Sequence, residues 1–195
     1  MESNSLVTLL KSKLGEELLS CSWNINTAEC SIKPQKLLDI CRILKMDSQL
    51  AFDMLISVTA VDWMDQKDDR FEVVYHFLSL SHNARLRLKT YLPESNPSIA
   101  SLTQLWLSAD FMERECFDMY GIKFVGHPDL RRILMYDEFV GYPLRKDYPI
   151  QGKQPRVPMR HPEVGNTATQ MKRSPLVTIN SKNTNKIVNA QNIRN

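Results

Sequence analysis

The chain has 195 residues, of which 43% are hydrophobic, and this is enough for one packed domain with an appendage. Its most apolar stretch, Met54 to Trp63, is short and interrupted by polar residues, so the sequence offers no candidate for a membrane-spanning helix. The net charge of +3 is unevenly distributed along the chain. Residues 1–125 contain 13 Lys and Arg against 17 Asp and Glu and are acidic, whereas residues 126–195 contain 12 Lys and Arg against 5 Asp and Glu and are basic.

The cysteines and histidines argue against several kinds of site. No C-x-x-C pair is present, so we expect neither a disulfide framework nor an iron–sulfur loop, and we interpret the cysteines as small buried residues in a reducing compartment. The histidine spacings match no simple zinc site. The cysteines are Cys21, Cys30, Cys41 and Cys116, and the histidines are His76, His82, His127 and His161. Residues 1–20 lack an apolar signal core and are acidic, which predicts synthesis in the compartment of residence.

Two helices and a strand are predicted in the first fifty residues. Leucines recur every four residues from Leu6 to Leu18, which indicates an amphipathic helix. Pro34 suits the first turn of a second helix, whose buried stripe runs from Leu37 to Leu44. The stretch between them, Trp23 to Ile32, is predicted to be a strand.

Three stronger strands follow, and they complete the predicted domain. Met54 to Trp63 and Phe71 to Leu80 are rich in β-branched and aromatic residues, and Ala84 to Tyr91 alternates apolar and basic residues. We therefore predict an α+β fold: an antiparallel sheet of mixed order, with two N-terminal helices packed on one face. An extended, Pro-containing C-terminal ribbon and tail would follow, because seven of the ten prolines lie after residue 125.

The predicted domain boundary lies between residues 125 and 126. Residues 1–125 would form the globular α+β domain, which ends in a helix that starts near Asp110 and stops at Gly121. Residues 126–195 would form a basic, extended segment that docks on partner subunits, with a frayed distal end.

Glu113 is the unusual residue of this last helix. It falls inside an apolar arc, where an ionised carboxylate needs a hydrogen-bonding or cationic partner. A capping box with Asp110 as N-cap is one explanation. A pairing with Arg131 or Arg132 of the following loop is the other. Arg114 and Asp118 are four residues apart and can pair.

The segment from 110 to 150, DFMERECFDMYGIKFVGHPDLRRILMYDEFVGYPLRKDYPI, resembles the signature of the 30 kDa subunit family of respiratory complex I, which includes NADH dehydrogenase subunit 9. The family pattern has ten specified positions at fixed spacing. It is met by Glu113, Arg114, Glu115, Asp118, Met119, Tyr120, His127, Arg131, Ile133 and Leu134. The phrases GHPDLRRIL and PLRKDYP extend the resemblance, which covers about residues 6–152. Tyr142 departs from the family, which usually has His there.

The resemblance implies a scaffold role in the peripheral arm, without catalytic, cofactor-binding or metal-binding residues in this chain. FMN and iron–sulfur clusters would lie in neighbouring subunits. The partners would be the 49 kDa-type subunit and other peripheral-arm subunits in an obligate hetero-oligomer, without nucleic acid and without a membrane span. The chain would sit on the matrix side of the mitochondrial inner membrane or on the cytoplasmic face of a bacterial membrane. The interface residues, here called the charged signature, would be Glu113, Arg114, Glu115, Asp118, His127, Arg131, Arg132, Arg145, Lys146 and Asp147.

Other functions fit parts of the same pattern. An α+β domain with a basic tail also describes RNA-binding or ribosomal proteins, although the acidic domain and the absence of an RNA-binding consensus argue against them. Membrane-bound hydrogenases and the chloroplast NAD(P)H dehydrogenase-like complex use similar subunits. His127 could handle protons, but within Gly-His-Pro it more often serves as a structural hydrogen-bonding group.

Overall fold

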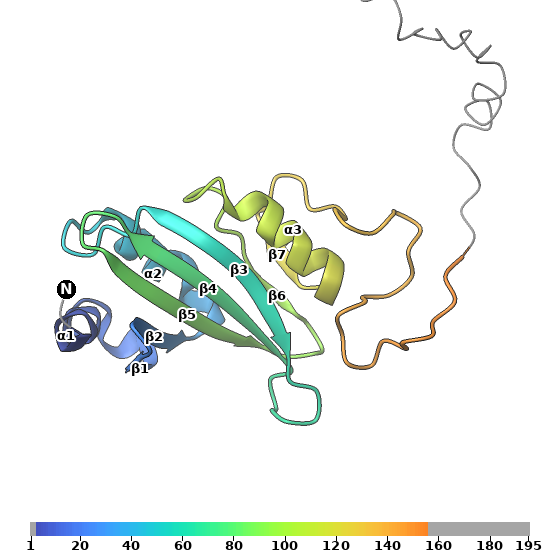
Figure 1. The fold of residues 1–195 in the computed structure, drawn as a ribbon, viewed down its shortest axis with the longest axis horizontal. Helices are drawn as coiled ribbons and strands as arrows, with labels where there is room; N and C mark the ends of the chain where they lie inside the picture. Colours follow the sequence, from blue (N-terminus) through green and yellow to red (C-terminus); the bar gives the residue numbers. More distant parts are fainter. Residues whose placement is uncertain (1–2, 156–195) are drawn as a thin grey trace, which may run out of the picture. The chain divides into compact units, whose positions relative to one another are not determined.

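The computed structural model describes residues 3–155, which belong to one compact unit ending at Pro155. It is an α+β fold with a five-stranded sheet in the order β1-β2-β5-β4-β3 (Figure 1). The elements are α1 (Ser3–Leu14), β1 (Leu18–Asn24), β2 (Thr27–Ile32), α2 (Leu37–Met46), β3 (Met54–Asp62), β4 (Phe71–Ser79), β5 (Ala84–Leu92), β6 (Ser98–Ala100), α3 (Ala109–Tyr120) and β7 (Lys123–Val125).

The predicted meander of three strands is confirmed as β3, β4 and β5, which pair antiparallel in sequence order. The sheet as a whole is mixed, because β2 pairs with β5 in parallel. The short strands β6 and β7 form a separate parallel pair. The fold is thus α+β, as predicted, with a mixed sheet in place of an antiparallel one.

The single strand predicted from Trp23 to Ile32 is wrong, because this stretch contains a hairpin turn. β1 and β2 are antiparallel neighbours joined by Ile25 and Asn26, which take positive φ angles of 40° and 60°. Two central residues with positive φ are typical of a tight hairpin turn, where Asn is common and Ile is not. The first helix also ends earlier than predicted, at Leu14, because Gly15 has a φ of 51°.

The register of this hairpin also corrects the expectation for two cysteines. Cys21 and Cys30 are directly paired across β1 and β2 with their Cα atoms 4.1 Å apart, and the structure joins them by a disulfide. Nothing in the spacing of the sequence indicates this pair, because it depends on where the turn falls. Cys41 and Cys116 are free and buried, and burial raises the pKa of both thiols.

One hydrophobic core joins the helices to the inner face of the sheet. Buried side chains of α1, α2 and α3 pack in one cluster with alternate residues of β2, β4 and β5. Phe77 is central, since its ring contacts Phe52, Tyr75 and Trp106. Figure 1 shows α2 behind the sheet, so the face turned to the viewer is free of helices within residues 3–155.

Residues 126–155, here called the ribbon, contain neither helix nor strand. They nevertheless belong to the same compact unit as the domain, which extends 30 residues beyond the boundary expected from the change in charge. The predicted frayed tail falls outside the described residues.

Candidate interaction site

Helix α3 is the platform on which the ribbon lies. It ends at Gly121, whose φ of 78° confirms the predicted glycine stop. A Cβ atom at Gly121 would meet the Tyr142 ring at 2.6 Å and the Arg145 guanidinium at 2.7 Å. Glycine is therefore required both by the backbone conformation and by the close approach of the ribbon.

Asp118 holds the ribbon against α3. Its carboxylate is fully buried and accepts hydrogen bonds from the backbone N–H groups of Ile133, Leu134 and Met135 at 3.1, 2.8 and 2.8 Å. Arg132 adds an ion pair of 2.6 Å. Burial alone would raise the pKa of Asp118, but these donors outweigh it and hold the pKa below its usual range. One carboxylate thus fixes four consecutive residues.

Arg132 extends this connection further along the ribbon. Its Nη2 donates to the carbonyl oxygens of Phe139 and Gly141 at 3.0 and 3.1 Å. The guanidinium carbon lies 5.7 Å from the centre of the Phe139 ring and 5.5 Å from that of Tyr142. A planar group with several donors suits such a junction. Arg132 therefore joins α3 to the part of the ribbon between Phe139 and Gly141.

The pair that helical spacing allows between Arg114 and Asp118 does not form. Arg114 donates instead to the carbonyl oxygens of Arg131 and Arg132, both at 3.3 Å. Asp118 is not free for it because Arg132 and the backbone of the ribbon occupy both oxygens. Helical spacing makes a pair possible, and tertiary contacts decide whether it forms.

Neither explanation offered for Glu113 is correct. Its side chain accepts hydrogen bonds from the Ser101 hydroxyl and the Leu102 backbone N–H, both at 2.7 Å. The helix is preceded by Ser108, so Asp110 is not the N-cap. Burial raises the pKa of Glu113, opposed by these two donors. The carboxylate ties α3 to the turn after β6.

His127 is a structural hydrogen-bonding group, the role more often found for histidine within Gly-His-Pro. Its side chain is fully buried, and its Nε2 lies 3.2 Å from both the backbone oxygen and Oδ1 of Asp110. The Asp129 backbone N–H donates to Nδ1 at 3.1 Å. The ring therefore carries its proton on Nε2 and fastens the start of the ribbon to the start of α3.

A second cluster, which the sequence analysis missed, is centred on Arg70. This buried guanidinium donates to both oxygens of Asp62, at 2.9 and 2.8 Å, and to Glu94 and Asp147 at 2.5 and 2.7 Å. The Lys146 backbone N–H donates to Asp62 at 2.8 Å. The ribbon is thus held at the end of the sheet as well as on α3. The sequence offered one signal for this cluster: an acidic residue, Asp62, ends an apolar strand, and Arg70 directly precedes the next strand.

Arg145 lies between the two clusters. Its Nε donates to the Tyr120 carbonyl oxygen at 2.6 Å, and its guanidinium carbon lies 4.9 Å from the centre of the Phe71 ring.

The remaining members of the charged signature point outward. Glu115 is exposed, the Lys146 side chain is exposed, and Arg131 forms only a surface pair with Asp129. Seven of the ten signature residues are thus engaged inside the chain.

The depressed pKa of Asp62 predicts an acid-sensitive ribbon. Burial opposes ionisation, but Arg70 and two backbone donors lower the pKa to about 2. A carboxylate with a lowered folded-state pKa stabilises the fold above its unfolded pKa and loses that contribution as the pH falls through the folded value. The shift corresponds to roughly 2 kcal/mol. In urea unfolding between pH 5 and 2, we expect Asp62→Asn to flatten the pH dependence of the native chain. Equal slopes would contradict this.

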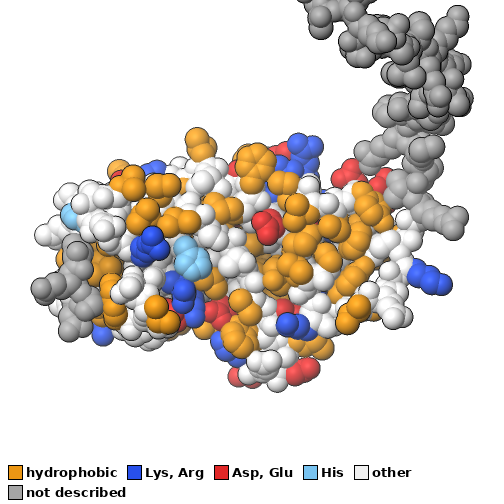
Figure 2. All heavy atoms as spheres, viewed as in Figure 1, with side chains coloured by type: hydrophobic (Ala, Val, Ile, Leu, Met, Phe, Trp, Pro, Cys, Tyr) orange, Lys and Arg blue, Asp and Glu red, His pale blue; other side chains and the backbone are white. Residues whose placement is uncertain are grey.

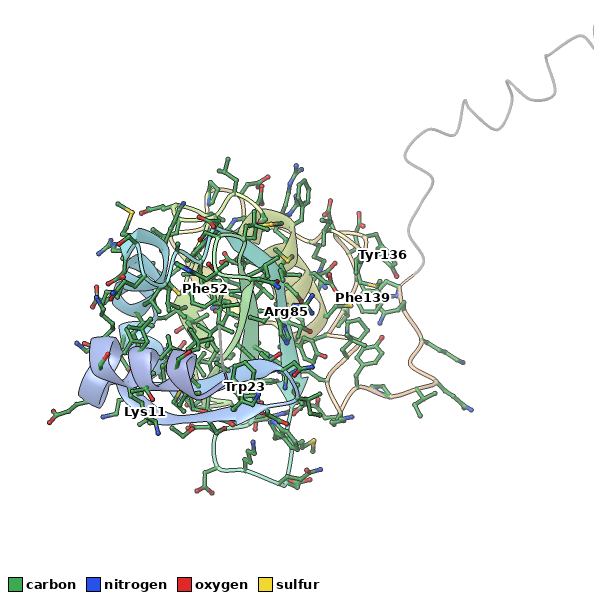
Figure 3. All side chains as sticks on the ribbon, turned by 60° about the vertical axis from the view of Figure 1, so that its left-hand side comes forward. Lys11, Trp23, Phe52, Arg85, Tyr136 and Phe139 are labelled. Carbon is green, nitrogen blue, oxygen red and sulfur yellow. A yellow bond between two sulfur atoms is a disulfide. The ribbon has the colours of Figure 1, made fainter. Side chains whose placement is uncertain are left out.

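The ribbon exposes several large apolar side chains. Figure 2 shows hydrophobic side chains gathered on the side that carries α3 and the ribbon. Figure 3 shows the aromatic pair Tyr136 and Phe139 on the ribbon, and their ring centres are 5.6 Å apart. The exposed large hydrophobic residues of the ribbon are Leu134, Tyr136, Val140, Leu144 and Ile150. Exposed apolar side chains gathered in this way are typical of interaction surfaces.

Comparison with known proteins identifies the family. Residues 30–154 match the family model described as respiratory-chain NADH dehydrogenase, 30 Kd subunit. The chain belongs to this family. The identification made from the family pattern is confirmed, and the chain is a complex I-type subunit of the respiratory chain.

Curated relatives support the same family. The chain is 46% identical over 151 residues to the C-type subunit of NADH-quinone oxidoreductase from Citrifermentans bemidjiense, a match that covers 77% of this chain and 92% of the relative. It is 42% identical over 151 residues to the corresponding protein of Geobacter sulfurreducens, with the same coverage. These relatives are bacterial, and the mitochondrial assignment stays a prediction.

Two solved structures share the fold. One is the trypsin-resistant fragment 1–134 of Nqo5, with a TM-score of 0.57, 28% identity, and coverage of 64% of this chain and 98% of the fragment. The other belongs to the membrane-bound sulfane sulfur reductase, an archaeal respiratory membrane complex, with a TM-score of 0.66 and 20% identity, covering 95% of this chain and 98% of that one. At that identity the second likeness concerns the fold alone.

No group of three or more His, Cys, Asp or Glu side chains between residues 3 and 155 is arranged to hold a metal ion. In the same part of the chain, every helix is too short or too polar to cross a bilayer.

Proposed function

We propose that this chain is a non-catalytic structural and assembly subunit of the peripheral arm of a proton-translocating NADH–quinone oxidoreductase. It would brace the subunits of the quinone module, chiefly a 49 kDa-type subunit, while electrons pass from NADH to quinone. FMN and iron–sulfur clusters would belong to neighbouring subunits. Family membership supports the setting. The bracing role is inferred from the site.

The observation that carries this proposal is the way the ribbon is held. Asp118 and Arg70, both buried, direct their charges toward fixing the ribbon to its own domain. The apolar side chains of the ribbon remain on the outside, where Leu134 is 58% and Val140 is 63% exposed. A surface that is fixed before binding loses less conformational entropy on association. The arrangement therefore suits a preformed docking surface.

The exposed charges of the same region would set the orientation of the partner. Glu115, Arg131 and Lys146 lie at the surface, and charged groups around an apolar centre contribute to specificity more than to affinity. The alternative of an RNA-binding protein is not favoured by the comparisons, which give respiratory subunits. Attachment to the matrix side of a mitochondrial membrane or to the cytoplasmic face of a bacterial one is part of this proposal.

The experiment compares Leu134→Asp with Leu19→Asp in the assembled complex. The two leucines are 58% and 57% exposed, but Leu19 lies on β1 at the far edge of the sheet from β3, the strand against which α3 packs. A charge placed in the centre of an interface must be desolvated, so we expect Leu134→Asp to reduce assembled complex at least about fivefold. Leu19→Asp should stay within about twofold of the native amount.

The readouts are the amount of complex on native gels and the quinone reduction per assembled complex. Turnover per complex should be unchanged in both variants, because a scaffold does not take part in the reaction. Normal assembly of Leu134→Asp with slowed quinone reduction would contradict the proposal. Equal loss of assembly in the two variants would also contradict it.

A further inference from the structure

The helix-free face of the sheet carries a cage of two aromatic rings and one carboxylate around an ammonium group. Lys67 Nζ lies 4.1 Å from the centre of the Trp63 ring and 4.5 Å from that of Tyr91. It is 3.4 Å from the Glu72 carboxylate and 3.4 Å from the Tyr91 hydroxyl. Aromatic faces with a nearby acid form the usual recognition site for alkylammonium groups.

The walls of the cage are placed by the sheet. Glu72 of β4 is paired directly with Tyr91 of β5, and Trp63 follows the last residue of β3. The indole N–H of Trp63 donates to Glu72 at 2.5 Å, and the Trp63 backbone N–H donates to the Arg70 carbonyl oxygen at 2.8 Å. Trp63 is therefore held by hydrogen bonds of its own to Glu72 and Arg70, and Tyr91 is placed by the pairing of its strand with β4.

Lys67, which fills the cage, comes from a different part of the structure than the residues that form its walls. Lys67 lies on the loop between β3 and β4, which extends beyond the end of the sheet (Figure 1). Residues 65–69 of this loop are all exposed, and the Lys67 side chain is 37% exposed. A cation on an exposed loop thus fills a site made by three ordered segments.

The charge at the base of the cage favours a cation. The Glu72 side chain is only 3% exposed, and a buried carboxylate needs compensation. Lys89 lies 3.4 Å from it, but the same ammonium is closer to Glu29, at 2.7 Å. Lys89 is therefore shared between two acids, and Glu72 retains attraction for the group inside the cage.

We propose that Trp63, Glu72 and Tyr91 form a binding site for an alkylammonium ion, and that Lys67 occupies this site as a tethered ligand. Removal of Lys67 leaves the rings and the carboxylate in place for a free cation. A tethered group competes at an effective concentration in the millimolar range or above, so the native chain should bind a free ammonium ion weakly.

The test uses the full chain and tetramethylammonium chloride, with sodium chloride at equal ionic strength as reference. The indole N–H signal of Trp63 in a ¹H–¹⁵N spectrum, assigned with Trp63→Phe, reports on the cage. In Lys67→Met we expect a saturable shift and an affinity at least about tenfold higher than in the native chain. Lys123→Met removes the same charge from the exposed strand β7 and should behave like the native chain.

Two further variants separate the cage from general charge effects. Lys67→Arg keeps a cation in the cage and should bind as weakly as the native chain. Lys67→Met combined with Tyr91→Leu removes one ring and should lose most of the gain. The proposal is overturned if Lys67→Met binds no more tightly than Lys123→Met, or if loss of the Tyr91 ring has no effect. Lys67→Gln, with a polar side chain, provides the same comparison should the methionine variant aggregate.

Discussion

Replacement of Arg70 by methionine is expected to lower the free energy of unfolding by about 3–5 kcal/mol, because it leaves a buried carboxylate without its cation. The Asp62 side chain is 1% exposed, and Arg70 contacts both of its oxygens. Glu94 and Asp147 lose their partner as well, but they are 61% and 47% exposed and can be solvated by water. The cost therefore arises mainly from Asp62.

Urea unfolding of the full chain at pH 7 measures this effect. Arg42→Met is the matched control, because Arg42 pairs with Asp39 at 3.7 Å while both side chains are more than half exposed. Surface pairs of this kind contribute about 0–1 kcal/mol. Asp62→Asn combined with Arg70→Met should recover part of the loss, since the amide needs no counter-ion. Similar losses for Arg70→Met and Arg42→Met would show that the cluster does not hold the fold.

The elements with strong periodicity could be predicted from the sequence. β3, β4 and β5 lie within one residue of their predicted ends, and the glycine stop at Gly121 is where the sequence indicated. These features depend on local residue patterns. The hairpin at Ile25 and Asn26 was missed because its turn lacks glycine, and the parallel pairing of β2 with β5 has no local pattern at all.

For the charged signature, too, the sequence indicates which residues matter but not which contacts they make. Its residues were recognised in the sequence, but the partners considered for them do not occur: Asp110 does not cap α3, Glu113 does not meet an arginine, and Arg114 does not pair with Asp118. Each depends on contacts with segments distant in the chain. Helical spacing shows which side chains can meet within one helix and cannot show which distant donors compete for them.

Most of the charged signature binds other groups of the same chain, and this changes the role that we assign to it. Had the residues been a solvated face or an ion-pairing surface for the partner, they would be exposed. Asp118 and Glu113 are fully buried instead, and the side chain of Arg132 is 16% exposed. The signature therefore shapes the ribbon, and the outward residues between its members are the ones available to another protein.

Asp118→Asn is the sharpest test of this division between holding and docking. The amide has one acceptor oxygen in place of two, and its NH₂ group would face either the N–H donors of Ile133 to Met135 or the guanidinium of Arg132, which bind different oxygens of Asp118. We expect a loss of about 3 kcal/mol in urea unfolding, from an ion pair and unsatisfied donors. Glu115→Gln removes one carboxylate from the exposed side of the same helix and should change stability by less than about 0.5 kcal/mol.

In the assembled enzyme the same variant should act through the ribbon. Without the Asp118 carboxylate the apolar docking surface is no longer fixed, so we expect less assembled complex, with normal quinone reduction in each complex that forms. Native gels and activity per complex measure the two quantities separately. If Asp118→Asn unfolds at the same urea concentration as Glu115→Gln, the buried carboxylate does not hold the ribbon. If the variant is destabilised but assembles fully, the ribbon is held as described and is not the docking surface.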